Sequence, residues 1–278
     1  MKRFFIVCIV CAATLAAMAQ KDLTILHTND THSCVSPLNP NLADTMIANR
    51  GGFIRRAEMV RQERRKCPKL LLLDSGDFSQ GSPYYNIYKG EVEVGLMNRM
   101  GYDAATIGNH EFDFGLENMA RLFRMAKFPI VCANYDFTGT PVEGLVRPYV
   151  IIRRNGLKIG IFGLAPKMEG LVSADNCRGV RYNDPIKTGN DIAKMLKEEK
   201  RCDVVICLSH LGWDISGTDD TEMMRGTRNI DLVLGGHSHS YFKELRYENN
   251  LDGKAVPNDQ NGKHGVFVGK LKMKFEKR

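Results

Sequence analysis

The chain has few of the features that identify several common classes of protein. It contains one tryptophan in 278 residues, no apolar run of the ~20 residues that a membrane-crossing helix needs, and no dense basic block interleaved with aromatic residues. These absences argue against a stable membrane span and against nucleic acid as a partner. With 43% apolar and 26% charged residues, the sequence is instead typical of a globular protein with a core of ordinary size.

The N-terminus has the pattern of an export signal. Met1-Lys2-Arg3 precedes an apolar run over residues 4–17, which closes on Ala17-Met18-Ala19 before Gln20. A basic start, a short apolar run and a small-x-small site predict a cleaved signal peptide over residues 1–19, rather than an uncleaved membrane anchor, and a periplasmic location. Without these residues, 37 basic and 32 acidic side chains leave a net charge of +5, a mild excess that favours capture of anionic substrates.

The cysteines beyond the predicted signal are not spaced as a metal site. Cys132 and Cys207 lie in apolar stretches and are predicted to be buried thiols that pack like small hydrophobic side chains. Export permits disulfides, but the sequence does not determine which cysteines would pair. The six cysteines after residue 19 are Cys34, Cys67, Cys132, Cys177, Cys202 and Cys207.

Short, continuous apolar runs alternate with helical patterns along the chain. Strands are predicted over residues 23–27, 70–73, 104–107, 129–132, 204–208 and 232–234, and helices over residues 53–66, 92–100, 116–127 and 186–200. Strands of this kind are buried on both faces, and their alternation with helices predicts an α/β fold.

The remaining segments suggest a second kind of strand pairing. Residues 149–153 and 157–164 flank Asn155-Gly156 and predict a hairpin, and residues 265–276 alternate like a strand. The polar stretch over residues 249–264 reads as one exposed loop. A single domain over residues 20–278, with two mixed sheets between helical layers, would accommodate these elements.

Polar motifs follow the predicted strands and contain five of the chain's seven histidines. Since the carboxyl ends of strands form the ligand crevice in open α/β sheets, we expect these residues to converge at one rim. The motifs are Asp30-Thr31-His32, Gly76-Asp77, Gly108-Asn109-His110-Glu111, Asp113, Ser209-His210, Gly236-His237 and Ser238-His239.

The residue types in these motifs suit two divalent metal ions. Two Asp, one Asn and four His side chains favour Zn, Mn, Co or Fe over an all-oxygen calcium site. In two-metal hydrolases the ions lie about 3.5–4 Å apart and activate a water molecule. A centre that keeps a net positive charge attracts a phosphate dianion, so a metal-dependent hydrolase is the leading hypothesis.

Four of these runs resemble a known family. His27-Thr28-Asn29-Asp30-Thr31-His32, Gly76-Asp77-Phe78-Ser79-Gln80-Gly81, Gly108-Asn109-His110-Glu111-Phe112-Asp113 and Gly236-His237-Ser238-His239 are similar to motifs of the calcineurin-like metallophosphoesterases, and more narrowly of the catalytic domain of secreted 5′-nucleotidases. The resemblance covers about residues 22–275, with the motifs in family order. It implies a four-layer αββα sandwich of two mixed sheets flanked by helices.

The resemblance also implies a role for each motif residue. Asp77 would bridge the two ions, and His110 would act as general acid on the leaving group, with Asp113 orienting its ring. The implied ligands of one ion are Asp30, His32 and His239, and those of the other are Asn109, His210 and His237. A metal-bound hydroxide would then attack the phosphorus of a phosphate monoester, most simply a nucleoside 5′-monophosphate.

The resemblance leaves several alternatives open. Family members usually continue into a C-terminal domain that binds the substrate, and this sequence ends before it, so a separate substrate-binding chain is one possible partner. A phosphodiesterase or pyrophosphatase acting on cyclic nucleotides or nucleotide sugars, or a thiosulfate-ester hydrolase, would share the metal core. A metal-binding subunit with negligible turnover of its own is the alternative from outside enzymology.

Five further residues near the motifs have structural explanations. His27 is predicted to be buried packing, Asp74 a structural neighbour of Asp77, and Glu111 a support for its loop. Trp213 is predicted to line the cleft or to pack in the core or at the rim, and His264 to be solvent exposed.

Overall fold

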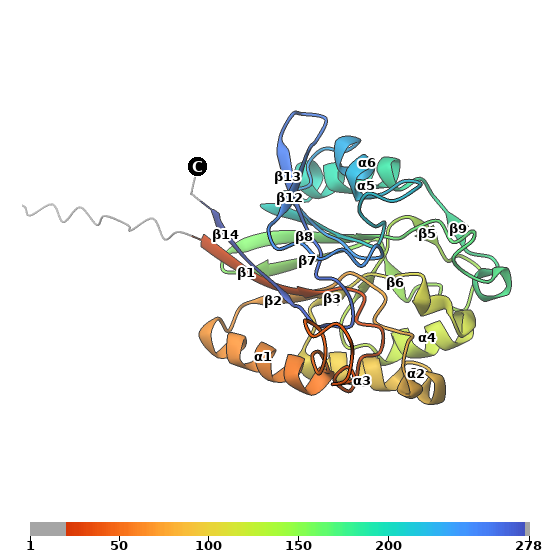
Figure 1. Ribbon diagram of the computed structural model, residues 1–278. Coiled ribbons are helices and arrows are strands. Elements are labelled where there is room, and N and C mark those ends of the chain that lie inside the picture. The colour runs from red at the N-terminus through yellow and green to blue at the C-terminus, as the bar shows by residue number, and fades with distance from the viewer. Residues whose placement is uncertain (1–20, 276–278) are drawn as a thin grey trace, which may run out of the picture.

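The computed structural model describes residues 21–275 (Figure 1), so the predicted signal peptide over residues 1–19 lies outside the described part. The strands are β1 Lys21–Thr28, β2 Leu71–Asp74, β3 Ala104–Ala105, β4 Ile130–Val131, β5 Tyr135–Asp136, β6 Val146–Arg147, β7 Tyr149–Arg154, β8 Leu157–Leu164, β9 Arg181–Tyr182, β10 Val204–Ser209, β11 Leu232–Leu234, β12 Arg246–Asn249, β13 Ala255–Asp259 and β14 Gly269–Phe275. The helices are α1 Phe53–Lys66, α2 Pro83–Tyr88, α3 Glu91–Met100, α4 Gly115–Met125, α5 Pro185–Lys194 and α6 Asp220–Arg225, with 3₁₀ turns at His110–Phe112 and Ala174–Cys177 and a π-helical turn at Met195–Glu199.

Two six-stranded mixed sheets form the centre of the molecule. The first has the order β14-β1-β2-β3-β4-β6, and the second has the order β12-β13-β11-β10-β8-β7. In the first sheet only β14 runs antiparallel to its neighbour, whereas in the second sheet both edge strands, β12 and β7, do. In both sheets the interior strands are parallel, so their carboxyl ends lie at a common edge.

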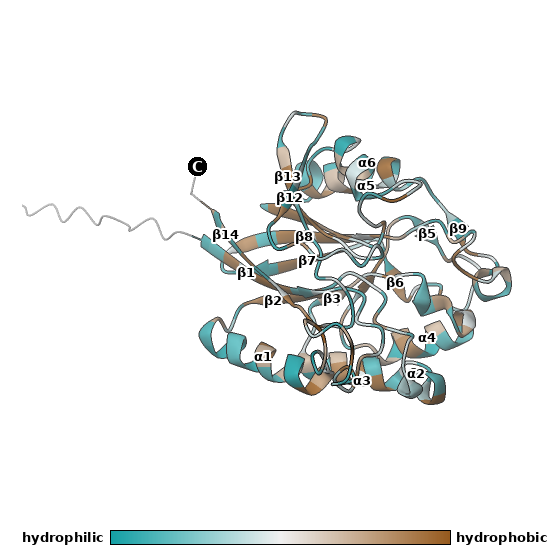
Figure 2. Cartoon of the chain, in the orientation of Figure 1, coloured by the Kyte–Doolittle hydropathy of each residue, from teal (hydrophilic) through white to brown (hydrophobic). Residues whose placement is uncertain are grey.

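Three separate hydrophobic cores show that the sheets are stacked in layers. Alternate residues of one strand face opposite sides of a sheet, and on β1 Ile25 packs between the two sheets while Leu26 packs against the helices of the first. On β10, Ile206 faces the first sheet and Val205 faces the helices of the second. The first sheet is covered on its outer face by α1–α4 and the second by α5 and α6 (Figure 1), and Figure 2 shows hydrophobic residues along the strands. The predicted αββα sandwich is therefore confirmed.

Most predicted elements agree with the structure. The helix over residues 53–66 and the hairpin are found as α1 and as β7 with β8, and the strand predicted over residues 265–276 begins only at Gly269. The helices α2 and α6 were not predicted because six residues are too few to show a helical period. Within residues 21–275, no helix is long and apolar enough to span a bilayer.

The prediction of one exposed loop over residues 249–264 is wrong. Its centre is β13, which pairs in parallel with β11 inside the second sheet. The polar side chains of residues 258–261 are buried and bond to other buried groups: Asn258 donates to Asp220 at 2.8 Å, and Asp259 bonds to the ring of the buried His27 at 2.8 Å.

Candidate metal centre

The predicted ligands meet at the carboxyl ends of strands from both sheets. Backbone hydrogen bonds join the loops after β1 and β2, with the Asp30 N–H donating to the Gly76 carbonyl at 2.9 Å. The Ser75 hydroxyl donates to the Leu234 carbonyl at 2.8 Å, which ties the first sheet to the second. Asp30, His32, Asp77 and Asn109 follow strands β1 to β3, and His210, His237 and His239 follow β10 and β11.

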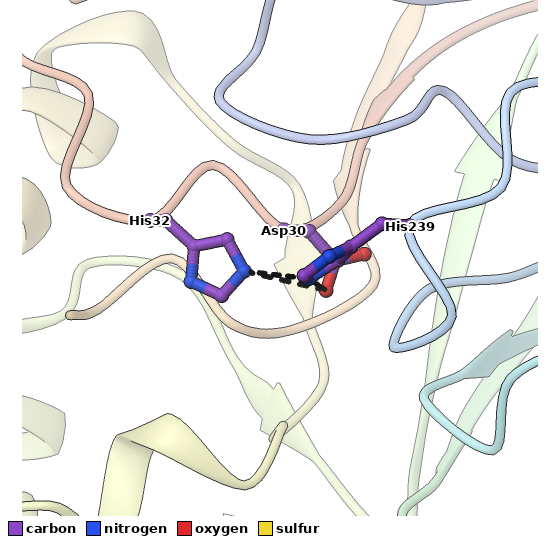
Figure 3. A group of neighbouring side chains, drawn as sticks. All are labelled: Asp30, His32 and His239. Carbon is purple, nitrogen blue, oxygen red and sulfur yellow. Dashed lines mark hydrogen bonds and ion pairs between the residues drawn. The ribbon is translucent and has the colours of Figure 1, made fainter. Parts of the chain in front are cut away.

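Asp30, His32 and His239 form one group of ligand atoms. Figure 3 shows Asp30 and His32 on one loop and His239 on another, with the three side chains directed toward one another. His32 Nε2 lies 2.9 Å from His239 Nε2, and Asp30 Oδ1 lies 3.8 Å from the first and 3.5 Å from the second. One cation could contact all three atoms.

Asp77, His210 and His237 form a second group, with ligand atoms within 4.8 Å of one another. His210 Nε2 lies 3.1 Å from Asp77 Oδ2 and 3.8 Å from Asp30 Oδ1. Asp77 also groups with His32 and His110. Since Asp77 has ligand atoms of both groups around it, its carboxylate is placed to be shared between them.

Five of the seven predicted ligands have left-handed backbone conformations. Their φ angles are 48° at Asp30, 41° at His32, 52° at Asp77, 70° at His237 and 55° at His239. Such conformations are uncommon for residues with a Cβ and cost of order 1–3 kcal/mol each. Backbone strain of this kind concentrates at functional sites, where it aims side chains inward.

Three of the histidines are held in the neutral form that binds a metal. Burial is the main cause that lowers the pKa of His32 to about 3 and the pKa values of His237 and His239 to about 4. A neutral imidazole keeps a lone pair for a metal ion.

His210 lies between two buried carboxylates, and its pKa is raised rather than lowered. Although burial alone would lower its pKa, the charges of Asp77 and Asp30 raise the pKa of His210 to about 10. Burial raises the pKa of Asp30 to about 7, whereas His210 contributes to a lowered pKa of Asp77. The carboxylates thus attract positive charge at this point, and a divalent cation would supply it in place of a proton on His210.

Unpartnered buried atoms fit the same interpretation. His210 Nδ1 donates to the Ser75 carbonyl at 2.6 Å, which leaves Nε2 facing Asp77 without a hydrogen-bond partner, and Asn109 Oδ1 is buried and also unpartnered among the described residues. Buried polar atoms normally have partners, so a bound ion would satisfy these two. Carboxylate, amide oxygen and imidazole together suit divalent transition ions.

Glu111 supports the metal loops more extensively than the sequence suggested. Its buried carboxylate accepts from the backbone N–H groups of Gly108 at 2.7 Å, Asp77 at 3.0 Å and Ser79 at 3.1 Å. Burial and the charge of Asp77 raise the pKa of Glu111 to about 7. One side chain thus joins the loop that carries Asp77 to the loop that carries Asn109.

Two asparagines that the sequence did not single out orient Asp30. The Asn29 amide donates to Asp30 Oδ2 at 2.6 Å and to the Gly262 carbonyl at 2.8 Å, and its oxygen accepts from the Asn261 N–H at 2.9 Å. His27 lies behind them as buried packing, as predicted, with Asp259 on its ring. The only signal for Asn29 was its position inside the motif run.

His110 and Asp113 form the predicted pair beside the predicted ligands. His110 Nδ1 lies 3.1 Å from an Asp113 oxygen, and its backbone N–H donates to Asp77 Oδ1 at 2.9 Å. Burial acts to lower the pKa of His110, but the hydrogen bond to Asp113 and the charge of Asp77 raise it overall. His110 is 30% exposed, so it can reach both the metal ligands and solvent.

Two further residues that the sequence singled out, Trp213 and His264, lie close to the predicted ligands. Trp213 packs edge-on against Phe242, with ring centroids 5.3 Å apart, and its backbone N–H donates to the Ser238 hydroxyl at 3.0 Å. His264 was predicted to be exposed, but it is half-buried with its ring 5.8 Å from that of His32. Packing against the metal site, which its polar sequence context did not reveal, explains that error.

The six cysteines in the described part of the chain are free thiols, and Cys132 and Cys207 are buried as predicted.

Comparison with known proteins agrees with this geometry. Residues 23–241 match the family described as calcineurin-like phosphoesterase. The human 5′-nucleotidase is 34% identical over 276 residues, which cover 92% of this chain and 47% of that protein. A trifunctional nucleotide phosphoesterase of Bacillus subtilis is 29% identical over 289 residues, which cover 92% of this chain and 18% of that protein.

Solved structures share the fold. A 5′-nucleotidase precursor from Thermus thermophilus superposes with a TM-score of 0.83 at 29% identity, over 92% of this chain and 52% of that one. The NAD nucleotidase of Haemophilus influenzae gives a TM-score of 0.83 at 27% identity, over 93% and 54%. This chain thus spans about half the length of the nucleotidases it matches. Because the family match extends over most of the chain, this protein belongs to the calcineurin-like phosphoesterases, a family of hydrolases.

Proposed function

We propose that this protein hydrolyses phosphate monoesters at a centre of two divalent metal ions, with nucleoside 5′-monophosphates as its substrates. The observation that carries the proposal is that Asp77 groups with His210 and His237 and also with His32 of the other ligand group, directly beside the pair of His110 and Asp113. A structural metal site needs no such pair. A proton donor at the rim of a metal centre suits a reaction that expels an alkoxide.

The proposed ligands divide between the two ions, with Asp77 shared. Asp30, His32 and His239 would hold one ion, and Asn109, His210 and His237 the other. Bound divalent ions at such a centre lower the pKa of an attacking water and neutralise charge that develops on the phosphoryl oxygens. The ions themselves, whether Zn, Mn, Co or Fe, are not distinguished by these donors.

The protein's own side chains position and protonate the substrate. Asp113 holds His110 Nδ1, which orients the ring and favours the imidazolium form, so Nε2 carries the proton that the leaving oxygen needs. The N–H of His110 bonds to Asp77, which links the position of the acid to the position of the shared ligand. Glu111 keeps both loops in register.

Replacement of His110 tests the proposed acid. We expect His110→Ala to lower kcat for 5′-AMP by about 10²- to 10⁴-fold with metal content unchanged. The loss should be much smaller for 4-nitrophenyl phosphate, because its leaving group departs without a proton. His264→Ala, a second histidine near His32 with no proposed role, is the matched control. An equal loss on both substrates, or no loss at all, would contradict the assigned role.

A pyrophosphatase or phosphodiesterase is the runner-up, because the NAD nucleotidase of Haemophilus influenzae shares the fold closely. Product analysis separates the two: release of inorganic phosphate from 5′-AMP supports the monoesterase, and cleavage of NAD to two nucleotides supports the runner-up. Turnover of an aryl phosphate but of no nucleotide would indicate that a separate substrate-binding chain is required. Two bound metals without turnover would indicate a metal-binding subunit.

We also propose that the protein is exported to the periplasm after cleavage before Gln20. The basic start and short apolar run over residues 1–19 support this. The mass of the protein recovered from the periplasmic fraction should match a chain that begins at Gln20. An intact Met1 on a protein found in the cytoplasm would rule the proposal out.

A further inference from the structure

A cavity beside the pair of His110 and Asp113 has no role in the proposed mechanism. Its volume is about 440 Å³, within the range of roughly 300–1,000 Å³ that is typical of small-molecule sites. We call it the Asp113 cavity. Gln80, Gly81, Tyr85 and Asn86 line it from the segment after β2, and Asp113 and Phe114 line it from the segment before α4.

The Asp113 cavity borders both a predicted metal ligand and the proposed acid. Gly81 packs on the loop that carries His32, since a Cβ at Gly81 would lie 3.0 Å from the His32 carbonyl oxygen. Tyr85 is buried, and its hydroxyl donates to the His110 carbonyl at 3.2 Å. The ring centroids of His32 and His110 lie 5.4 Å apart. An alcohol that departs at His110 is therefore next to the cavity.

The carboxylate of Asp113 joins the cavity to the proposed acid. One of its oxygens lies 3.1 Å from His110 Nδ1, and its side chain is 34% exposed. A carboxylate has about four lone-pair positions, so Asp113 can accept from a ligand hydroxyl as well as from His110.

The lining suits a neutral ligand that carries hydroxyl groups. The side-chain amides of Gln80 and Asn86 each offer both a donor and an acceptor. No lysine or arginine is among the described residues that line the cavity, and the charge of Asp113 repels an anion. Gln80 also has a φ of 72°, a conformation that is uncommon for residues with a Cβ and concentrates at functional sites.

Phe114 gives the cavity an apolar wall. Its side chain is 37% exposed, and its ring centroid lies 5.0 Å from that of Tyr85. A wall of this kind with a few polar groups beside it selects ligands that have an apolar face and a polar edge. A sugar ring has both, because its C–H groups form a face and its hydroxyl groups form an edge.

We propose that the Asp113 cavity binds the sugar of a sugar phosphate ester, the ribose of a nucleotide included, and that Gln80 and Asn86 recognise its hydroxyl groups. This inference rests on the proposed phosphomonoesterase activity and narrows its substrates to esters of sugars. In the reaction, water attacks phosphorus and the P–O bond to the sugar breaks. The proton of His110 goes to the departing sugar oxygen, so the products are the free sugar alcohol and inorganic phosphate.

The relative rates of two substrates test the proposal. Ribose 5-phosphate and pentyl phosphate release primary alcohols of equal carbon number, and only ribose carries further hydroxyl groups. We expect the ratio of their kcat/KM values to fall about fivefold in Asn86→Ala, as the loss of one neutral hydrogen bond predicts. Ile87→Ala is the matched control, because Ile87 is the next residue of α2, is exposed and does not line the cavity. It should leave the ratio unchanged.

Gln80→Asn tests the second amide. Asparagine tolerates a positive φ, so the backbone conformation at this position is kept while the amide is withdrawn by one methylene. The same ratio should fall in this variant. An unchanged ratio in both Asn86→Ala and Gln80→Asn would overturn the proposal.

Binding of phosphonates separates a failure of this inference from a failure of the proposed function. Phosphonates in which CH₂ replaces the ester oxygen of the two substrates cannot be hydrolysed, and calorimetric titration of the metal-loaded protein measures their affinities. Asn86→Ala should weaken binding of the ribose phosphonate about fivefold and leave binding of the alkyl phosphonate unchanged. That result without phosphate release from any ester would refute the proposed activity but support the sugar site. Equal effects on both phosphonates would overturn the sugar site whatever the activity.

Discussion

Replacement of Glu111 by alanine should destabilise the protein and loosen its hold on metal at the same time. The carboxylate is the acceptor for three buried backbone N–H groups, those of Asp77, Ser79 and Gly108. An orphaned buried donor costs about 1–3 kcal/mol, so the three together should lower the free energy of unfolding by at least about 3 kcal/mol. Water that enters the space left by the Glu111 side chain would bond to some of these N–H groups, which is why we take the low end of the range.

The assay is urea unfolding in the presence of chelator, so that bound metal does not contribute to the stability difference. It is best done near pH 5, because the raised pKa of Glu111, about 7, makes the stability of the wild type relative to the variant fall as the pH rises through that value. Glu117→Ala is the matched control, because Glu117 is exposed in the first turn of α4 and should change stability by about 0.5 kcal/mol or less.

Metal affinity is the second quantity to measure in this variant. Because Glu111 fixes the backbone on which Asp77 lies, Glu111→Ala should also raise the dissociation constant for both ions. A variant as stable as the wild type that binds metal equally well would refute the reasoning that Glu111 joins the two loops.

Four further variants test other parts of the account. Asp77→Asn should lower occupancy by both ions as well as turnover, and full occupancy by two ions would exclude the shared position. Burial raises the pKa of Asp220 to about 7, so the stability of the wild type relative to Asp220→Asn should be greatest below about pH 4 and fall as the pH rises through 7. The midpoints of urea unfolding measure this difference, and a difference that stays constant with pH would contradict the expectation. A Cβ at Gly269 would lie 2.0 Å from His27 Nε2, whereas one at Gly95 in α3 would meet nothing within 4 Å, so thermal unfolding should show Gly269→Ala strongly destabilised and Gly95→Ala stabilised by about 0.5–1 kcal/mol.

The layers of the fold could be predicted because burial on both faces leaves a direct trace in the sequence. Leu71, Leu72 and Leu73 on β2 are all fully buried, with alternate residues in two different cores. Such a run excludes a strand with one face in water. The order of strands across each sheet is set by contacts between distant segments, and no local pattern reports it.

The polar segment over residues 249–264 shows where composition misleads. Asparagine, glycine and aspartate are typical of exposed loops, but Asn258 and Asn261 are buried and hydrogen-bonded to Asp220 and to the His27 ring. Polar residues can be buried when most of their groups find partners, and these partners are too far away in the sequence to be recognised. The same limit hid the role of Asn29.

The candidate ligand residues could be named from the sequence, but the backbone conformations that direct their side chains could not. A positive φ is uncommon for residues with a Cβ, although Asp and His adopt it more often than most, and nothing local predicts it at Asp30, Asp77 or His237. The α6 helix was predictable in retrospect from its start, since the Asp219 side chain caps the N–H of Glu222 in the manner of an Asp-x-x-Glu signal.

The most direct test of the central claim is phosphate release from 5′-AMP by the purified protein, measured with added Mn, Co or Zn, after chelation, and after the metal is restored. A metal-dependent monoesterase should release phosphate, lose that activity with chelator and regain it with metal. Phosphate release that persists in chelator after both ions have been removed, or none in a protein that holds both ions, would contradict the account.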